Sequence, residues 1–318
     1  MSDRHILLIV GAGRSGTSLT AGVIAALGWR VPQPEMSPNK ANLRGFGEPR
    51  WVVEFHSELL RESQVATMDS RPVAFEIASR AACDPAVGRR LESWLGHQLA
   101  DAGQLVIKDP RTAWFLQLWQ DSARSIGVGI SYLTVLRHPA EVVASARRFY
   151  DARRSDAGLT ASWVNIMVNT ERSTRGFARS FVQYDRLLAD WSAETGRVAA
   201  ELDLRSLAHP TPEQRAAVDG LITPELRRAP PGWDQLTVPT DLRDVADRTW
   251  DRLNALVGAP PRSQPADNLD VQAAYERLYA DAESVAESSI VAVQAAAEAR
   301  RLRHRASSVV RACRRVVG

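Results

Sequence analysis

A glycine-rich segment directly after a short apolar run is the feature that most constrains the fold. Residues 6–10 are all aliphatic, which is typical of a buried strand. Residues 11–18 read GAGRSGTS, and residues 18–27 then follow a helical pattern that ends at Gly28. A strand, a tight turn and a helix in this order present backbone N–H groups and a helix N-terminus to an anion. The chain is therefore predicted to open with a phosphate-binding loop.

Predicted strands and helices alternate over the following part of the chain. Further buried strands are predicted at residues 105–107, 130–136 and 180–184. Helices are predicted from Pro139, over residues 161–175 and over residues 186–204. This alternation indicates an α/β fold with a parallel sheet covered by helices on both faces. Ligands of such sheets bind beyond the carboxyl ends of the strands.

The last third of the chain differs in composition. Residues 209–232 are rich in proline and are predicted to be irregular, whereas the chain from residue 270 is alanine-rich and helical. Residues 300–315 combine arginines with apolar residues at helical spacing, which predicts a basic amphipathic helix. We therefore expect an α/β domain over residues 1–260 and a helical C-terminal extension over residues 261–318. The terminal helix either packs on protein or lies on an anionic membrane surface.

Composition limits the classes of function. The six histidines are scattered and the two cysteines form no ligand cluster, so no metal site is expected, and a reducing cytoplasm is the expected compartment. The longest early apolar run is too short for a signal peptide or a membrane span. Of the 40 basic residues, only Lys40 and Lys108 are lysines. A lysine retained in an arginine-rich chain marks a site that needs a compact ammonium group.

The glycine-rich loop differs from that of nucleotide triphosphatases at one decisive position. Its spacing fits the pattern GxxxxGK[ST], but Thr17 stands where the lysine would be. A phosphoryl-transfer enzyme needs that lysine, together with a carboxylate for magnesium. The positive charge lies instead at Arg14, three positions earlier.

A second anion-binding pattern lies in residues 136–145, LRHPAEVVAS. Arg137 ends a predicted strand, Pro139 suits the first position of a helix, and Ser145 follows Arg137 by eight residues. An arginine fork and a hydroxyl group are suitable donors to a phosphate dianion. The alternative is a helix start with an incidental serine.

Together, the two segments resemble the PAPS-dependent sulfotransferase family, where PAPS is 3′-phosphoadenosine-5′-phosphosulfate. RSGTS is similar to the RSGTT and RSGSS loops of tyrosylprotein, carbohydrate and bacterial sulfotransferases, and residues 136–145 resemble the family's 3′-phosphate motif. The resemblance implies a P-loop-type sheet. It implies that the 5′-phosphosulfate is bound by Gly13, Arg14, Ser15, Gly16, Thr17 and Ser18. It likewise implies that Arg137 and Ser145 bind the 3′-phosphate.

The resemblance extends over roughly residues 6–188. Tyr184, in QYDRLL, is similar to a tyrosine that lies near the adenine in the family. The late Arg-Lys-Gly motif that the cytosolic members place on the 3′-phosphate is missing from this sequence. The rest of the 3′-phosphate pocket is therefore left unassigned.

The resemblance also supplies candidate catalytic residues. Lys108, in KDPR, resembles the lysine of the tyrosylprotein KDP segment and would stabilise the transferring charge together with Arg14; the alternative is a structural pair with Asp109. Aryl sulfotransferases have a histidine two residues after this lysine, where this chain has Pro110. That difference favours a carboxylate as the base, either Glu48 in NLRGFGE, which we favour, or Glu35.

His56 is a third candidate for the base. Its spacing with Val52 and Leu59 on a helix also fits a packing or surface role. A base must reach the acceptor hydroxyl before its pKa matters, and that reach is a property of the folded chain.

The predicted function is transfer of a sulfuryl group from PAPS, without a metal, to a hydroxyl of a carbohydrate, glycolipid or secondary-metabolite acceptor. No nucleic acid partner is expected, and the oligomeric state is left open. Acceptor contacts are expected from the loops around residues 30–80, 150–165 and 210–240. The alternatives are a P-loop small-molecule kinase and a non-catalytic nucleotide-binding protein.

Overall fold

The computed structural model of the chain describes residues 4–37, 47–149, 154–223, 226, 232–259 and 270–282. The chain divides into two compact units, residues 1–272 and residues 273–318. Residues 273–282 of the second unit are helical. The predicted basic amphipathic helix lies outside the described residues, and the predicted boundary at residue 260 stays a prediction.

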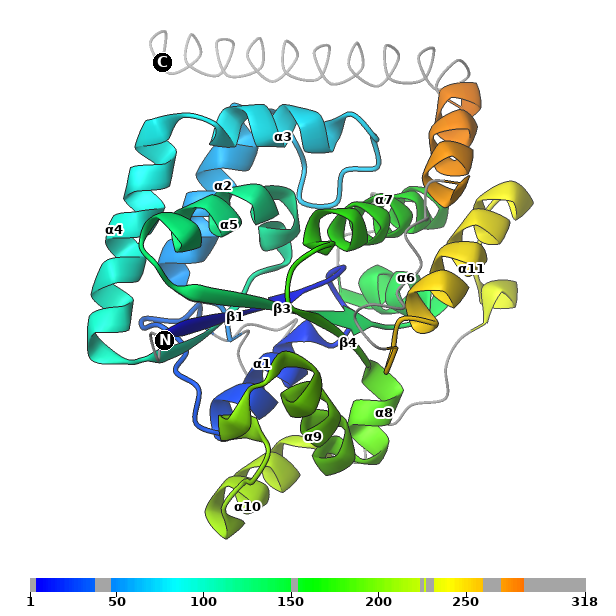
Figure 1. The fold of residues 1–318 in the computed structure, drawn as a ribbon. Helices are drawn as coiled ribbons and strands as arrows, with labels where there is room; N and C mark the ends of the chain where they lie inside the picture. Colours follow the sequence, from blue (N-terminus) through cyan, green and yellow to red (C-terminus); the bar gives the residue numbers. More distant parts are fainter. Residues whose placement is uncertain are drawn as a thin grey trace, which may run out of the picture. The chain divides into compact units, whose positions relative to one another are not determined.

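The first unit is built around a parallel sheet of four strands (Figure 1). The strands are β1 (His5–Val10), β2 (Gln104–Lys108), β3 (Gly129–Leu136) and β4 (Arg179–Gln183), in the order β2-β1-β3-β4. All three pairings are parallel, so the four carboxyl ends lie along one edge. The predicted α/β class with a parallel sheet is confirmed.

Helices cover both faces of this sheet (Figure 1). One face carries α1 (Thr17–Ala26), α8 (Tyr184–Ala189), α9 (Trp191–Leu202), the short 3₁₀ helix η2 (Arg205–Leu207) and α10 (Pro212–Leu221). The other carries α2 (Arg50–Glu62), α3 (Ala74–Ala82), α4 (Pro85–Asp101), the 3₁₀ helix η1 (Pro110–Phe115), α5 (Leu116–Ser125) and α7 (Asp156–Thr174). The helices α6 (Pro139–Phe149) and α11 (Thr240–Asn254) pack against α7, and the short helix η4 (Trp233–Gln235) precedes α11.

The core explains why the strands are runs of apolar residues. Every residue of β1 from Ile6 to Val10 is at most 1% exposed, because helices lie on both sides of the strand. Leu7 and Ile9 pack with the apolar face of α1, and Val198 and Leu202 bring α9 into the same cluster. Residues two apart on a strand point to the same face, which places the alternate positions against the other helical layer.

Two sequence predictions were wrong in detail. The predicted helix over residues 186–204 is two helices, because Asp190 leaves the helical conformation and its side chain caps α9 by accepting the N–H of Ala193. Residues 209–232 are not irregular throughout, since α10 lies within them. Thr211 and Gln214 form a capping box there, so the following Pro212 starts a helix instead of breaking one.

Candidate active site

The glycine-rich loop lies at the carboxyl end of β1 and packs closely on its neighbours. A Cβ atom on Gly11 would lie 2.8 Å from the carbonyl oxygen of Val135, and one on Gly16 would lie 2.2 Å from Cδ2 of Tyr184. Both glycines have a positive φ, which other residues adopt at a cost. The loop therefore needs glycine at both positions, and Gly16 lies directly against Tyr184.

Ser15 lies inside this loop. Its N–H donates to the carbonyl of Ala12 at 3.2 Å, and its side chain is fully buried. Among the described residues, its hydroxyl has no hydrogen-bond partner. Buried hydroxyl groups almost always have a partner, so this one is suited to a ligand oxygen bound in the loop.

The two predicted anion-binding segments are in direct contact. Nε of Arg14 donates to Oγ of Ser145 at 3.2 Å, and Nη1 of Arg137 donates to the carbonyl of Arg14 at 3.3 Å. The guanidinium of Arg137 also lies over the ring of Tyr184, 4.6 Å from its centroid. The structure thus brings Arg14, Arg137, Ser145 and Tyr184 together at one edge of the sheet.

Glu141 belongs to the same group but was not predicted. Nε of Arg137 donates to its Oε2 at 2.9 Å, and the carboxylate is mostly buried. The signal was present in the sequence, because an acidic residue four positions after an arginine at a helix start can pair with it. Glu141 fixes one edge of the Arg137 guanidinium.

Lys108 ends β2, which flanks β1 on the side opposite to β3, and it lies beside the loop. The parallel register places it opposite Ile9, at the carboxyl end of β2. Its Nζ donates to Oγ of Ser18 at 3.1 Å and to Oε1 of Glu48 at 2.5 Å. The alternative pair between Lys108 and Asp109 is not found, because the lysine pairs with Glu48.

Burial shapes the chemistry of Glu48. The residue is 7% exposed, and this burial raises the pKa of its carboxyl above the usual value. The ammonium of Lys108 opposes the rise, whereas the negative charge of Asp109 adds to it. A carboxyl group with a raised pKa is a stronger base once it is ionised, which suits a proton acceptor.

The backbone of Glu35 lies close to that of Glu48, but the side chain of Glu35 has a different partner. The N–H of Met36 donates to the carbonyl of Glu48 at 2.8 Å, so the two segments run side by side. The Glu35 carboxylate accepts instead from Nε2 of Gln33 at 2.7 Å, on the exposed side. Of the two glutamates, only Glu48 contacts Lys108 in the described part of the chain. The identity of the base stays a prediction.

Both ring nitrogens of His56 are hydrogen-bonded to other side chains. It is fully buried, its Nδ1 bonds Oδ2 of Asp109 at 2.8 Å, and its Nε2 accepts the indole N–H of Trp119 at 3.0 Å. The contacts of His56 fit the role of a packing residue better than the role of a base. Its contact with Asp109, directly after Lys108, was not predicted.

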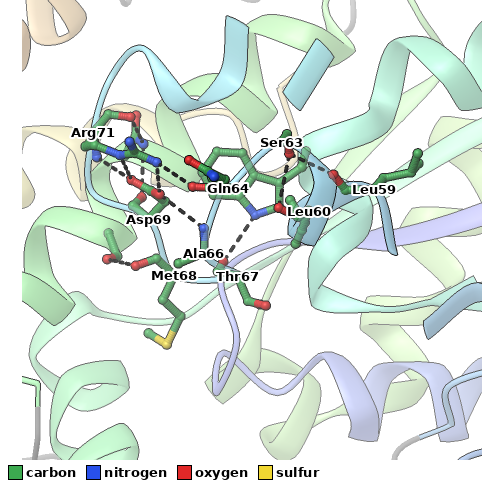
Figure 2. Close-up of polar contacts among 12 residues, drawn as sticks. Leu59, Leu60, Ser63, Gln64, Ala66, Thr67, Met68, Asp69 and Arg71 are labelled. Carbon is green, nitrogen blue, oxygen red and sulfur yellow. Dashed lines mark hydrogen bonds and ion pairs between the residues drawn. The ribbon is translucent and has the colours of Figure 1, made fainter. Parts of the chain in front are cut away.

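The loop after α2 is fixed to the elements behind the site. Figure 2 shows Arg71 and the N–H of Ala66 bonded to the carboxylate of Asp69. The carbonyl of Thr67 accepts the indole N–H of Trp114, at 3.1 Å, so the loop is joined to η1. The carbonyl of Met68 accepts from Ser162 of α7 at 2.6 Å, which joins two of the regions where acceptor contacts are expected.

The described residues provide neither a metal site nor a membrane span. They contain no group of three or more His, Cys, Asp or Glu side chains that could hold a metal ion. None of the helices within them combines the length and the apolar character that a membrane span requires.

No protein-family model and no curated protein matches the chain. Among solved structures, it is similar to the sulfotransferase domain of the olefin synthase from Synechococcus PCC 7002, at 16% identity and a TM-score of 0.46, over 79% of this chain and 94% of that one. It is also similar to the sulfotransferase domain from the curacin biosynthetic pathway, at 14% identity and a TM-score of 0.46, over 79% of this chain and 98% of that one. The chain is thus similar to two sulfotransferase domains, at low sequence identity.

Proposed function

We propose that this chain transfers a sulfuryl group from PAPS to a hydroxyl group of an acceptor that is a carbohydrate, a glycolipid or a secondary metabolite. The observation that carries the proposal is the contact between the two anion-binding segments, in which Arg14 bonds Ser145 and Arg137 bonds the carbonyl of Arg14. Because these groups touch, a single nucleotide with a phosphate at each end of its ribose can contact both segments.

The donor would be held mainly by the loop and by the start of α6. The loop from Gly13 to Ser18 and the N-terminus of α1 would bind the 5′-phosphosulfate. The buried Ser15 hydroxyl, which has no partner in the described residues, would donate to it. Arg137 and Ser145 would bind the 3′-phosphate with charge-assisted hydrogen bonds. Tyr184, between Gly16 and Arg137, would lie near the adenine.

In the transfer step, the bond between sulfur and the bridging phosphate oxygen breaks and a bond between sulfur and the acceptor oxygen forms. The acceptor's proton passes to the Glu48 carboxylate, and the electron pair of the broken bond stays on the phosphate oxygen. Lys108 and Arg14 would stabilise the charge that collects on that oxygen. Positioning and charge stabilisation dominate a loose in-line transfer of this kind.

The two alternatives make different predictions. A small-molecule kinase would use ATP and lose activity with EDTA, but Thr17 stands at the position of the lysine that such an enzyme needs. A non-catalytic binding protein would bind the donor without turnover on any acceptor. Mass spectrometry of products formed from labelled PAPS and a cell extract separates all three and identifies the acceptor.

The donor site is tested by the affinity for adenosine 3′,5′-bisphosphate (PAP), measured by calorimetry. Arg14→Ala and Arg137→Ala should each weaken binding about tenfold to a hundredfold, because a hydrogen bond to a charged group contributes about 1.5–3 kcal/mol. Arg124→Ala is the matched control, since Arg124 is exposed and pairs with Asp121 on α5, just before the start of β3 at the opposite edge of the sheet. Unchanged affinity in both site variants would count against the proposed function.

A further inference from the structure

Arg111 is a mostly buried cation that the proposed mechanism leaves without a task. Its side chain is 23% exposed, and its Nη1 donates to Oδ1 of Asp109 at 2.7 Å. The same oxygen accepts the backbone N–H of Arg111 at 3.2 Å. A guanidinium carries five N–H donors, and in the described part of the chain the others have no hydrogen-bond partner. Most of the donors of Arg111 are therefore free for a ligand.

The position of Arg111 is next to the reaction centre. It lies three residues after Lys108, and a Cβ atom on Gly13 of the loop would lie 4.0 Å from Cβ of the adjacent Pro110. The charge of Arg111 also reaches Glu48, where it helps to lower the pKa of the carboxyl against the effect of burial. The residue before Arg111 thus contacts the loop, and the charge of Arg111 acts on the Lys108–Glu48 pair.

A buried chain of hydrogen bonds lies behind Arg111. The indole N–H of Trp119 can only donate, so the Nε2 of His56 that it contacts must accept and carries no proton. The Nδ1 of His56 therefore carries a proton and donates to Asp109. The ring is further held by stacking on Phe115, with the centroids 5.2 Å apart.

Asp109 is the link between this chain and Arg111. Burial alone would raise the pKa of Asp109, but the hydrogen-bonded His56 beside it and, to a smaller extent, Arg111 outweigh this effect and hold the pKa below its usual value. Asp109 therefore remains a carboxylate, with one oxygen bonded to His56 and the other to Arg111. Neither oxygen can turn away without losing a buried hydrogen bond, so the direction of the Arg111 guanidinium is fixed before a ligand binds.

We infer that Arg111 binds the sulfuryl group of the donor and that Trp119, His56 and Asp109 are the residues that position it. The inference rests on the proposed function. A sulfuryl group has three oxygens over which negative charge spreads during transfer, more than the single ammonium of Lys108 can contact. A fixed guanidinium with free N–H groups supplies the missing donors.

The test compares two nucleotides that differ by the sulfuryl group. Calorimetry on the full chain gives the affinities for PAPS and for PAP. Arg111→Gln should weaken PAPS binding about tenfold to a hundredfold and leave PAP binding within about twofold, since a hydrogen bond to a charged group contributes about 1.5–3 kcal/mol. Arg111→Lys keeps the charge but loses the fork and should give a smaller loss of PAPS affinity. Arg124→Gln is the control.

The positioning residues are tested with the ratio of the PAPS affinity to the PAP affinity. His56→Leu cannot donate to Asp109 and should lower the PAPS affinity selectively, whereas His56→Asn can donate and should restore it. If His56→Leu lowers the melting temperature but leaves the ratio unchanged, the network is structural only. If wild type binds neither nucleotide, the proposed function fails. If wild type binds both and Arg111→Gln keeps the wild-type ratio, the proposed function stands and the inference is overturned.

Discussion

Two buried glutamates at opposite edges of the sheet are held in different ways. Glu171, near the start of β4, accepts from Nε and Nη2 of Arg175 at 2.6–3.0 Å and pairs with Nη2 of Arg179 at 3.1 Å. Glu48, at the carboxyl edge, accepts one side-chain hydrogen bond in the described part of the chain, from Lys108. Both residues are less than a tenth exposed.

The difference separates a fully paired buried carboxylate from an incompletely paired one. Removing a carboxylate from water costs several kcal/mol, and the cost is offset only when hydrogen bonds occupy its oxygens. Two guanidinium groups occupy the oxygens of Glu171. A single ammonium occupies the oxygens of Glu48 only in part, and burial raises the pKa of that carboxyl. The buried charge at the amino edge is fully paired, and the incompletely paired carboxylate at the carboxyl edge is the one that the proposed function uses as proton acceptor.

The largest effect that would test this comparison is on turnover. Glu48→Gln should lower the rate of sulfuryl transfer by about 10²–10⁴-fold, since it removes the proton acceptor, and should leave PAP affinity nearly unchanged. Glu35→Gln is the matched control and should keep the wild-type rate. The rate is measured with labelled PAPS and the acceptor identified from the extract. The opposite pattern would move the base to Glu35.

The pH profile of the same variants sharpens this result. A base must be ionised, so the rate falls as the pH drops through its pKa. Because burial raises the pKa of Glu48, the acid limb of the wild-type profile should lie above the range of an ordinary glutamate. The Glu48→Gln profile should lack this limb.

The next largest effect is on stability, at the amino edge. Glu171→Leu should lower the free energy of unfolding by about 3–5 kcal/mol, because it removes the carboxylate that balances the buried charge of Arg179. Urea titration measures the loss, and PAP affinity should not change. Glu76→Gln, in an exposed pair with Arg80, is the control and should cost less than about 1 kcal/mol. Equal losses in the two variants would remove the distinction between the edges.

A smaller effect on stability is expected when both members of the site pair are replaced together. Glu48→Met with Lys108→Met should leave stability unchanged or raise it by about 1–4 kcal/mol, because apolar side chains avoid the cost of burying two ions. Turnover should be lost. A large drop in the urea midpoint would show that the pair supports the fold as Glu171 does.

The strands and the loop could be predicted because their signals are local. The run at residues 6–10 lies within β1 (His5–Val10), and the strand predicted at 130–136 is β3 (Gly129–Leu136) to within one residue. A parallel strand buried on both faces reads as a continuous apolar run, and a tight turn demands glycine. These patterns involve neighbours in sequence only.

The contacts that position the site could not be predicted from the sequence, because they join residues that lie far apart in it. His56 and Asp109 are 53 residues apart, and Arg14 and Ser145 are 131 apart. No spacing rule connects such pairs, since they meet only through the packing of α2 on η1 and of the loop beside α6. Glu141 was a local signal that was overlooked, whereas the partner of Lys108 needed the folded chain.

The burial of Lys108 between Ser18 and Glu48 makes it a natural spectroscopic reporter. With Lys40 as the other lysine of the chain, isotope-labelled lysine gives two ammonium signals, and a Lys40→Arg variant assigns them. One of the two then comes from the centre where the donor and the base would meet. Nucleotide titrations can be followed at that atom before any acceptor is known.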